Sequence, residues 1–264
     1  MVDDVRVLIL EDDPFARNWM AMLAARDLRT RVIGEINDPS LLISFLERSA
    51  ERIDLILLDT DIPSGVDWIP RIRATLKSKN RFPRILCTGI TANPRVLSQL
   101  TDSFFTGYIL KEEIRNSLAW AISLTEKGYW IITDSIQALA SSIDFSLPRP
   151  CIVLEGRYAV QNLTPHQAHV ARLAFLFSME RRDLADELGV TEDWGYGLVS
   201  AVYEKIGLKD ILANDTNLGD YLGNHSLLTS YFEKICEESE GTGKARDMET
   251  LAFHLLTMPE MREL

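Results

Sequence analysis

Short apolar runs alternate with stretches of helical spacing along the first half of the chain. The apolar runs lie at residues 5–10, 54–58, 84–87 and 107–110. Between and after them, apolar residues recur three and four positions apart at residues 14–25, 40–49, 69–76, 94–101 and 112–126. Strands that alternate with helices indicate βαβ units. The pattern therefore predicts an α/β domain with a parallel sheet over residues 1–127.

The second half of the chain has a different pattern. Residues 128–162 contain Pro148 and Pro150 and two short β-like runs, so we interpret them as a linker that carries a small hairpin. Residues 163–222 have helical spacing and form a second, all-α domain. Residues 223–264 predict a C-terminal extension of two further helices.

Charge and composition limit the classes of function. The 264 residues carry a formal net charge of −11, which repels a polyanion such as DNA unless basic residues gather on one face. No apolar run is long enough to span a bilayer, and the first residues lack the basic start of a secretory signal, so we expect a cytoplasmic protein with no membrane partner. Cys87, Cys151 and Cys236 are far apart and odd in number, which favours buried free thiols.

Polar residues follow the four apolar runs of the first half. Glu11 and Asp12 follow the first run, Asp59 the second, Thr88 the third and Lys111 the fourth. The carboxyl ends of parallel strands line one crevice, so we expect these side chains to converge there. Three carboxylates, a hydroxyl and an ammonium suit a hard divalent cation and a phosphoryl group.

These groups predict a phospho-acceptor site that uses Mg²⁺. Asp59 is the expected nucleophile, because a carboxylate needs no deprotonation at neutral pH. Mg²⁺ removes the repulsion between a carboxylate and a phosphoryl donor. We expect Asp12 and Asp59 as direct ligands, Glu11 as a ligand through water, and the backbone carbonyl of Asp61 as a further ligand. Lys111 and Thr88 complete the predicted catalytic set by contacting phosphoryl oxygens.

The N-terminal half resembles the receiver domain of two-component response regulators. The resemblance rests on the segments 10–14, 58–63, 88–89 and 107–111, in order and spacing. It implies a doubly wound, five-stranded sheet, phosphotransfer from a sensor histidine kinase, and a switch in which Thr88 and Tyr108 reorient. Two positions depart from the family pattern: Asp67 stands where Gly is common, and Glu112 where Pro is frequent. Neither departure removes a reacting group.

The helical second half resembles the LuxR/NarL-type helix-turn-helix output domain. Residues 163–167 open a helix, and residues 182–191 have the spacing of a helix, a glycine turn and a second helix. The resemblance continues to residue 208. A receiver followed by this domain is a familiar arrangement in bacterial transcription regulators.

The expected recognition helix is poor in groups that contact DNA. Residues 191–201 include Glu192 and Asp193 but no Lys, Arg, Asn or Gln, and acidic residues outnumber basic ones between residues 164 and 222. The candidate output surface consists of Asp193, Trp194, Tyr196 and Leu198, a mixture suited to a protein contact. Burial of these aromatic side chains in the core is the competing interpretation.

Three hypotheses follow from the sequence. The first is a response regulator phosphorylated on Asp59 whose modified helix-turn-helix acts through protein contacts or self-association as a homodimer. The second has the same input but a DNA-binding output of the LuxR/NarL type, with Arg172, Arg181 and Arg182 contacting phosphates. The third is a docking scaffold that works without phosphorylation. No enzyme active site is expected beyond the phosphoryl chemistry of the receiver.

Overall fold

The computed structural model describes residues 5–27, 30–157, 163–208 and 244–264. The chain divides into two compact units. The first consists of Met1–Arg157 together with Pro259–Leu264, and the second is Tyr158–Met258.

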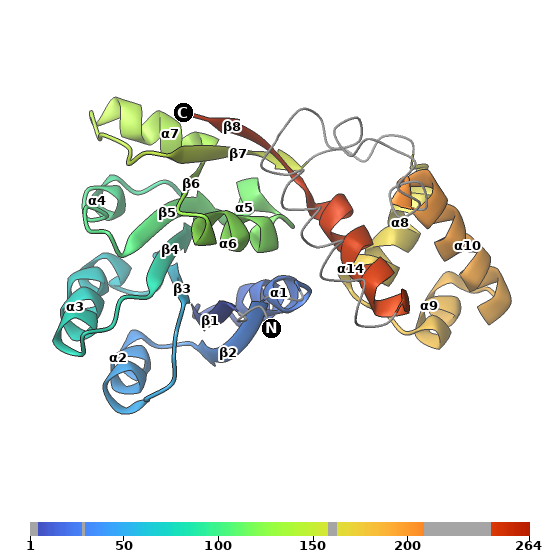
Figure 1. The fold of residues 1–264 in the computed structure, drawn as a ribbon, viewed down its shortest axis with the longest axis horizontal. Coiled ribbons are helices and arrows are strands. Elements are labelled where there is room, and N and C mark those ends of the chain that lie inside the picture. Colours follow the sequence, from blue (N-terminus) through green and yellow to red (C-terminus); the bar gives the residue numbers. More distant parts are fainter. Residues whose placement is uncertain (1–4, 28–29, 158–162, 209–243) are drawn as a thin grey trace. The chain divides into compact units, whose positions relative to one another are not determined.

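One sheet organises the first unit, with the strand order β2-β1-β3-β4-β5-β6-β7-β8 (Figure 1). Its first five strands are β1 (Val5–Leu10), β2 (Thr30–Ile36), β3 (Leu55–Asp59), β4 (Arg84–Gly89) and β5 (Phe105–Leu110). All neighbours among these five strands pair in parallel. The strand order reverses between β1 and β3, so a crevice opens at their carboxyl ends. The predicted doubly wound parallel sheet is confirmed.

Local sequence signals explain where the covering helices begin. These helices are α1 (Pro14–Ala25), α2 (Pro39–Arg48), α3 (Gly65–Ser78), α4 (Pro94–Leu97), α5 (Lys111–Ile114) and α6 (Leu118–Glu126). Three of them have Pro in the first turn behind a side chain that accepts backbone N–H groups: Asp13 for α1, Asp38 for α2 and Asn93 for α4.

The helix expected over residues 112–126 is divided into two. Arg115 has φ 48°, outside the right-handed helical region, and α5 ends one residue before it. Every residue from Leu118 to Thr125 in α6 is buried. A helix that is apolar all round is one that lies inside the protein, and this is why the pattern gave no amphipathic boundary.

The segment expected to be a linker with a small hairpin is instead a further βαβ unit. β6 (Trp130–Thr133) pairs in parallel with β5, and β7 (Cys151–Arg157) pairs in parallel with β6. Helix α7 (Asp134–Ser142) provides the crossover that parallel strands require. β6 has only four residues, all of them buried, so it shows neither alternation nor a long apolar run.

Gly107 allows β6 to approach β5. A Cβ atom at this position would lie 2.0 Å from the carbonyl oxygen of Ile131, so no larger residue fits without moving the strands apart. Two side chains strengthen the junction: Trp130 Nε1 donates to the carbonyl of Phe105 at 3.0 Å, and the Leu110 amide donates to Thr133 Oγ1 at 3.2 Å. Five strands therefore become a larger sheet.

The end of the chain also differs from the expected pair of helices. Helix α14 (Lys244–Thr257) matches the second predicted helix, whereas the first lies outside the described residues. β8 (Pro259–Glu263) follows α14 and pairs antiparallel with β7. The sequence boundaries at residues 127, 162 and 222 therefore do not coincide with the two compact units. A strand whose partner lies so far back along the chain leaves no local signal.

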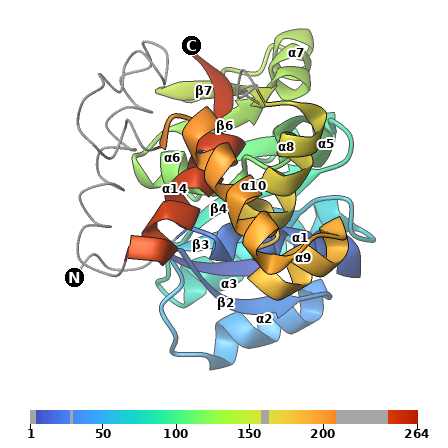
Figure 2. The same cartoon turned by 90° about the vertical axis from the view of Figure 1, so that its right-hand side faces the viewer.

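The second unit contains the predicted helix-turn-helix. Among its described residues, the helices are α8 (Pro165–Ala171), the π-helical η1 (Arg172–Leu176), α9 (Arg181–Leu188), α10 (Glu192–Lys205) and α14. Thr164 and Gln167 form a reciprocal capping box at the start of α8. Gly189, with φ 65°, ends α9 and turns the chain into α10, which packs beside α9 in Figure 2.

Two remaining predictions concern cysteines and membranes. Cys87 and Cys151 are free and buried, as expected, and Cys236 lies outside the described residues. Within the described ranges, no helix combines the length and apolar character needed to cross a bilayer.

Candidate functional site

The acidic turn after β1 gives its three carboxylates different environments. Glu11 is 1% exposed, whereas Asp12 and Asp13 lie at the surface. Asp13 Oδ1 caps α1 by accepting from the amides of Phe15 at 2.7 Å and Ala16 at 2.8 Å. Glu11 Oε1 accepts from the Asp13 amide at 3.3 Å. Glu11 and Asp12 are therefore the carboxylates of this turn that remain for the crevice.

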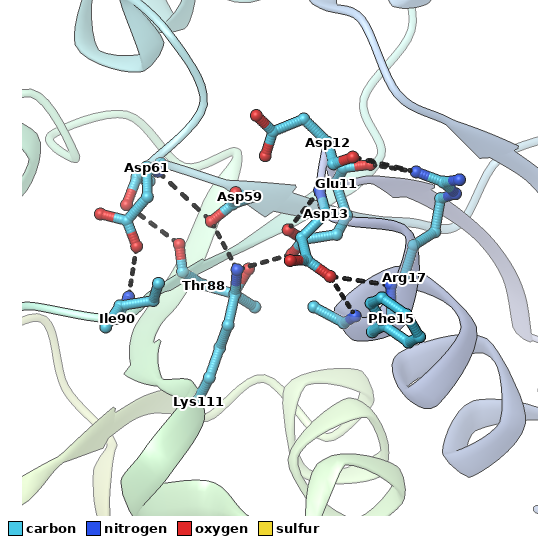
Figure 3. Close-up of polar contacts among 12 residues, drawn as sticks. Glu11, Asp12, Asp13, Phe15, Arg17, Asp59, Asp61, Thr88, Ile90 and Lys111 are labelled. Atoms are coloured by element: carbon cyan, nitrogen blue, oxygen red, sulfur yellow. Dashed lines mark hydrogen bonds and ion pairs between the residues drawn. The ribbon is translucent and has the colours of Figure 1, made fainter.

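Asp59 ends β3 beside this turn and is 1% exposed (Figure 3). Lys111, at the carboxyl end of β5, places its Nζ 3.0 Å from Asp59 Oδ1 and 2.6 Å from Glu11 Oε2. The Asp61 amide donates to the same Asp59 Oδ1 at 3.3 Å. Residues from three strand ends thus meet around one ammonium group, as the strand pattern predicted.

Burial controls the ionisation of this group. It raises the pKa of Glu11 from its ordinary value to about 7, although the hydrogen bond from Lys111 opposes the shift and the charge on Asp59 adds to it. Burial also raises the pKa of Asp59, against the charge of Lys111. Desolvation acts to lower the pKa of Lys111, but the hydrogen bond to Glu11 and the charge of Asp59 outweigh it, so this pKa is raised. The raised pKa values of Glu11 and Asp59 indicate that the positive charge of Lys111 does not fully offset the burial of these two carboxylates.

The donor set fits Mg²⁺. Glu11, Asp12 and Asp59 each offer a carboxylate oxygen, and these oxygens lie within 4.8 Å of one another. Mg²⁺ prefers oxygen ligands and retains water, which the exposed Asp12 side can supply. Three carboxylates around one lysine leave an excess of negative charge that a divalent cation compensates. The role of the Asp61 carbonyl stays a prediction; the Asp61 carboxylate accepts a hydrogen bond from the Ile90 amide.

The two expected switch residues lie on neighbouring strands. Thr88 is buried in β4, and its Oγ1 has no hydrogen-bond partner among the described residues. Tyr108 is fully buried in β5, and its hydroxyl donates to the carbonyl of Thr91 at 2.9 Å. Burial raises the pKa of Tyr108 to about 12, so the phenol keeps its proton. Their movement on phosphorylation stays a prediction.

Thr60 connects these two strands and was not singled out in the sequence. Its Oγ1 donates to the carbonyl of Thr88 at 2.9 Å and lies 3.4 Å from the Tyr108 hydroxyl. Gly89 lies against the same pair: a Cβ there would be 3.0 Å from Thr60 Oγ1 and 3.1 Å from the Tyr108 hydroxyl. A Thr directly after the acceptor Asp, followed by a strand ending in Thr-Gly, is a signal that was present in the sequence.

Asp67, the position that departs from the receiver pattern, lies in the first turn of α3. It lines a cleft of about 520 Å³ together with Asp12, Trp68 and Arg71. The Arg71 guanidinium lies 4.0 Å above the Trp68 ring. Asp67 therefore borders the approach to the Asp12 side of the site and does not enter the group of three carboxylates.

The candidate output surface is on α10. Asp193, Trp194 and Tyr196 are exposed, with 65% of Trp194 and 45% of Tyr196 accessible, and Leu198 is half-buried. The competing interpretation, in which these aromatic side chains form core, is therefore wrong. The Arg181 guanidinium lies 4.1 Å above the Tyr196 ring, so one of the few cations of this surface is engaged within the chain.

The fold and the crevice are those expected of a response-regulator receiver domain, and the second unit contains a helix-turn-helix. No protein-family model matches the chain. It is 27% identical over 141 residues to a nitrate/nitrite response regulator protein homolog of Haemophilus influenzae, covering 53% of this chain and 65% of that protein. It is 25% identical over 175 residues to the transcriptional regulatory protein RcsB of Escherichia coli, covering 65% and 74%.

A third relative spans more of the chain. The probable transcriptional regulatory protein NarL of Mycobacterium tuberculosis is 24% identical over 209 residues, covering 79% of this chain and 90% of that protein. Among solved structures, RcsB of Salmonella typhimurium superposes with a TM-score of 0.46 at 19% identity, covering 78% of this chain and 93% of that one. The homologues of this chain are therefore response regulators of the RcsB and NarL type.

Proposed function

We propose that the chain is a response regulator that accepts a phosphoryl group on Asp59 from a sensor histidine kinase. The observation that supports this most is the convergence of buried Asp59, Glu11 and Lys111 with the exposed Asp12 at three strand ends. Structural carboxylates seldom lie this close together, because their repulsion costs stability unless a cation is bound. One relative is named a response regulator protein homolog, which supports the class of protein proposed here.

The transfer step follows from the contacts of Asp59. Its Oδ1 already accepts from Lys111 and the Asp61 amide, which leaves Oδ2 to attack phosphorus. A P–O bond forms to Asp59 while the P–N bond of the phosphohistidine donor breaks, and the imidazole nitrogen keeps the electron pair and takes a proton. Lys111 offsets the charge that gathers on the phosphoryl oxygens. Glu11, Asp12, Asp59 and the Asp61 carbonyl would hold Mg²⁺, which supplies further charge compensation.

Thr88 and Tyr108 are proposed to report the phosphorylated state. The unpartnered Thr88 hydroxyl can donate to a phosphoryl oxygen on Asp59, because the two residues are register partners on β3 and β4. Movement of Thr88 would disturb its carbonyl, to which Thr60 Oγ1 donates, and so the Tyr108 hydroxyl next to Thr60. Phosphorylation would then change the position of the Tyr108 side chain on β5, the strand that pairs with β6.

Fluorine NMR of beryllofluoride tests the input. Beryllofluoride mimics a phosphoryl group on a carboxylate, so we expect bound fluorine resonances with Mg²⁺ and their loss without it. Asp59→Asn removes the attacking oxygen charge and should abolish the bound signal. Failure of the native chain to bind beryllofluoride in Mg²⁺, at a protein concentration where the fold is intact, would favour the phosphorylation-independent docking scaffold.

We propose that the output is control of transcription by DNA binding. Two relatives are named transcriptional regulatory proteins, and the helix-turn-helix spacing is that of a DNA-binding motif. This is the second of the sequence hypotheses, and the relatives support it better than they support the first. Within the described part of the helix-turn-helix, Arg172, Arg182 and Lys205 are exposed cations that would contact phosphates, and Arg181 is stacked on Tyr196.

A protein-directed output is the second candidate, favoured by the surface of α10. Glu192 and Asp193 are exposed at the start of this helix, which also carries the exposed Trp194 and Tyr196. Lys205 is the only basic residue between residues 192 and 205. Aromatic side chains within an acidic surface suit a protein contact better than a phosphate backbone. A homodimer stays a prediction under either candidate.

Salt-dependent DNA binding separates the two candidates. Fluorescence anisotropy with labelled duplexes should be measured for the beryllofluoride-treated chain between low and physiological salt. Each phosphate contact contributes a slope of about −0.9 in the logarithmic plot, so contacts from Arg172, Arg181, Arg182 and Lys205 together would give about −3.6 per protomer. A slope in this range that falls by about 0.9 in Arg182→Gln supports DNA binding. Absence of binding at low salt supports a protein partner.

A further inference from the structure

Arg17 on α1 reaches back to the turn that carries the acidic residues. Its Nη1 donates to the backbone carbonyl of Glu11 at 2.8 Å and lies 3.4 Å from the carbonyl of Asp12 (Figure 3). Its Nε lies 3.8 Å from Glu35 Oε2 on β2. Only 18% of the Arg17 side chain is exposed, whereas the Glu35 side chain is 40% exposed. The arginine therefore has a fixed place against the turn.

The other contacts of the turn leave these carbonyls to Arg17. The Glu11 amide donates to the carbonyl of Ile36 at 3.0 Å, which ties the start of the turn to β2. The Asp13 carboxylate caps α1 and ties down the end of the turn. Between these two anchors, the peptide planes of Glu11 and Asp12 set where both carboxylates point. The guanidinium contacts the carbonyl of each of these two planes, and the Asp13 amide also donates to Glu11 Oε1.

We propose that Arg17 is a positioning residue that holds the acidic turn so that Glu11 and Asp12 face the same cation as Asp59. The proposal rests on the function proposed above, because it gives Arg17 a role toward the Mg²⁺ that this site fits. A guanidinium suits this role, because it is planar, permanently charged, and presents several N–H donors in a fixed geometry. Among the described residues, the Arg17 side chain contacts the two carbonyls of the turn and Glu35, and none of the Glu11, Asp12 and Asp59 carboxylates, so its effect on them would pass through the turn.

The direction in which the Mg²⁺ affinity changes when Arg17 is substituted distinguishes a positioning role from a purely electrostatic one. A fixed positive charge near a cation site repels Mg²⁺, so removing a merely electrostatic Arg17 would tighten Mg²⁺ binding. Removing a positioning residue would weaken Mg²⁺ binding, because Glu11 and Asp12 would no longer be held facing the same cation. Groups that orient metal ligands typically change metal affinity by roughly 10-fold to 100-fold when they are substituted. The two explanations therefore predict changes in opposite directions.

Isothermal titration with MgCl₂ measures this difference directly. We expect Arg17→Gln to bind Mg²⁺ roughly 10-fold more weakly than the native chain. Arg17→Lys keeps the positive charge but loses the planar arrangement of N–H donors. Its Mg²⁺ affinity should lie between those of the native chain and Arg17→Gln. Arg31→Gln is the matched control, because it removes an exposed arginine from the opposite end of the neighbouring strand β2. Its Mg²⁺ affinity should equal that of the native chain.

Each outcome decides the proposal. Equal or tighter Mg²⁺ binding by Arg17→Gln overturns it, while beryllofluoride binding by the native chain would leave the proposed function intact. If Arg17→Gln does not fold, Arg17→Lys carries the test: weaker binding with an unchanged melting temperature supports positioning, and unchanged binding overturns it. A native chain that binds no Mg²⁺ overturns the proposed function and this proposal with it.

Discussion

The buried Glu11 carboxylate should make the stability of the first unit depend on pH. Its pKa is raised from an ordinary value of 4.5 to about 7 in the folded chain, chiefly by burial. Between these two values the folded state binds more protons than the unfolded state, so stability must fall as the pH rises. Glu11→Gln, which stays neutral at every pH, removes this dependence while leaving the other titrating groups in place.

The size of the effect follows from the shift. One pKa unit corresponds to about 1.4 kcal/mol, so a shift from 4.5 to about 7 corresponds to about 3 kcal/mol of stability. This contribution is complete below about pH 4.5 and is lost as the pH rises through 7. Asp59, whose pKa is also raised by burial, acts in the same direction. Mg²⁺ should oppose the loss, because it binds the ionised carboxylates: at about 100 times its dissociation constant it adds about 2.7 kcal/mol.

Urea denaturation followed by tryptophan fluorescence is the assay. Trp194 belongs to the second unit, so both chains should carry Trp194→Phe and the remaining tryptophans then report on the first unit. These are Trp19, Trp68, Trp120 and Trp130. Unfolding free energies are measured at pH 5 and pH 8, with and without Mg²⁺. The difference between the native chain and Glu11→Gln isolates the Glu11 contribution.

Without Mg²⁺, the native chain should lose stability through Glu11 between pH 5 and pH 8, and Glu11→Gln should not. The difference in unfolding free energy between the two chains should therefore change by most of the full effect of about 3 kcal/mol. This change should largely disappear in saturating Mg²⁺. An equal pH dependence in both chains would refute the reasoning, because it would mean that the Glu11 carboxylate is not held in an apolar, cation-deficient site.

Three further substitutions test the fold around the site. Gly107→Ala places a Cβ 2.0 Å from the carbonyl of Ile131 and should destabilise the first unit by roughly 3 kcal/mol or more, measured by urea unfolding. Thr60→Val loses the hydrogen bond to the Thr88 carbonyl and should cost about 1 kcal/mol in the same assay. Arg262→Ala breaks a half-exposed ion pair with Glu155. It should lower the free energy of unfolding by less than about 1 kcal/mol, measured by thermal unfolding. If Gly107→Ala leaves the free energy of unfolding unchanged, the close pairing of β5 with β6 is contradicted.

The site was predictable because each of its groups lies at the carboxyl end of a strand or directly after it. The apolar runs before Asp59 and Lys111 mark strands without reference to the rest of the chain, and parallel strands bring their ends together. Glu11 and Asp12 follow β1, and Thr88 lies near the carboxyl end of β4. Arg17 was not predicted, because its role depends on which carbonyls a helical side chain reaches, and spacing alone does not specify that.

The extension of the sheet was not predictable from local pattern. β6 is four buried residues with no alternation, and β8 contains Pro259 and three charged residues that resemble a loop. Both become strands because long-range partners exist: β6 next to Gly107, and β8 next to β7. Tertiary pairing overrides weak local propensity in such segments. On α10, the sequence left open whether Trp194 was buried, and the structure shows it exposed.

Intact mass measurement with peptide mapping after incubation with a phosphohistidine donor and Mg²⁺ tests the central claim most directly. We expect one added phosphoryl group on Asp59, sensitive to alkali as an acyl phosphate, and absent in Asp59→Asn or when Mg²⁺ is chelated. Phosphoryl transfer to another residue, or equal labelling of Asp59→Asn, would contradict the claim.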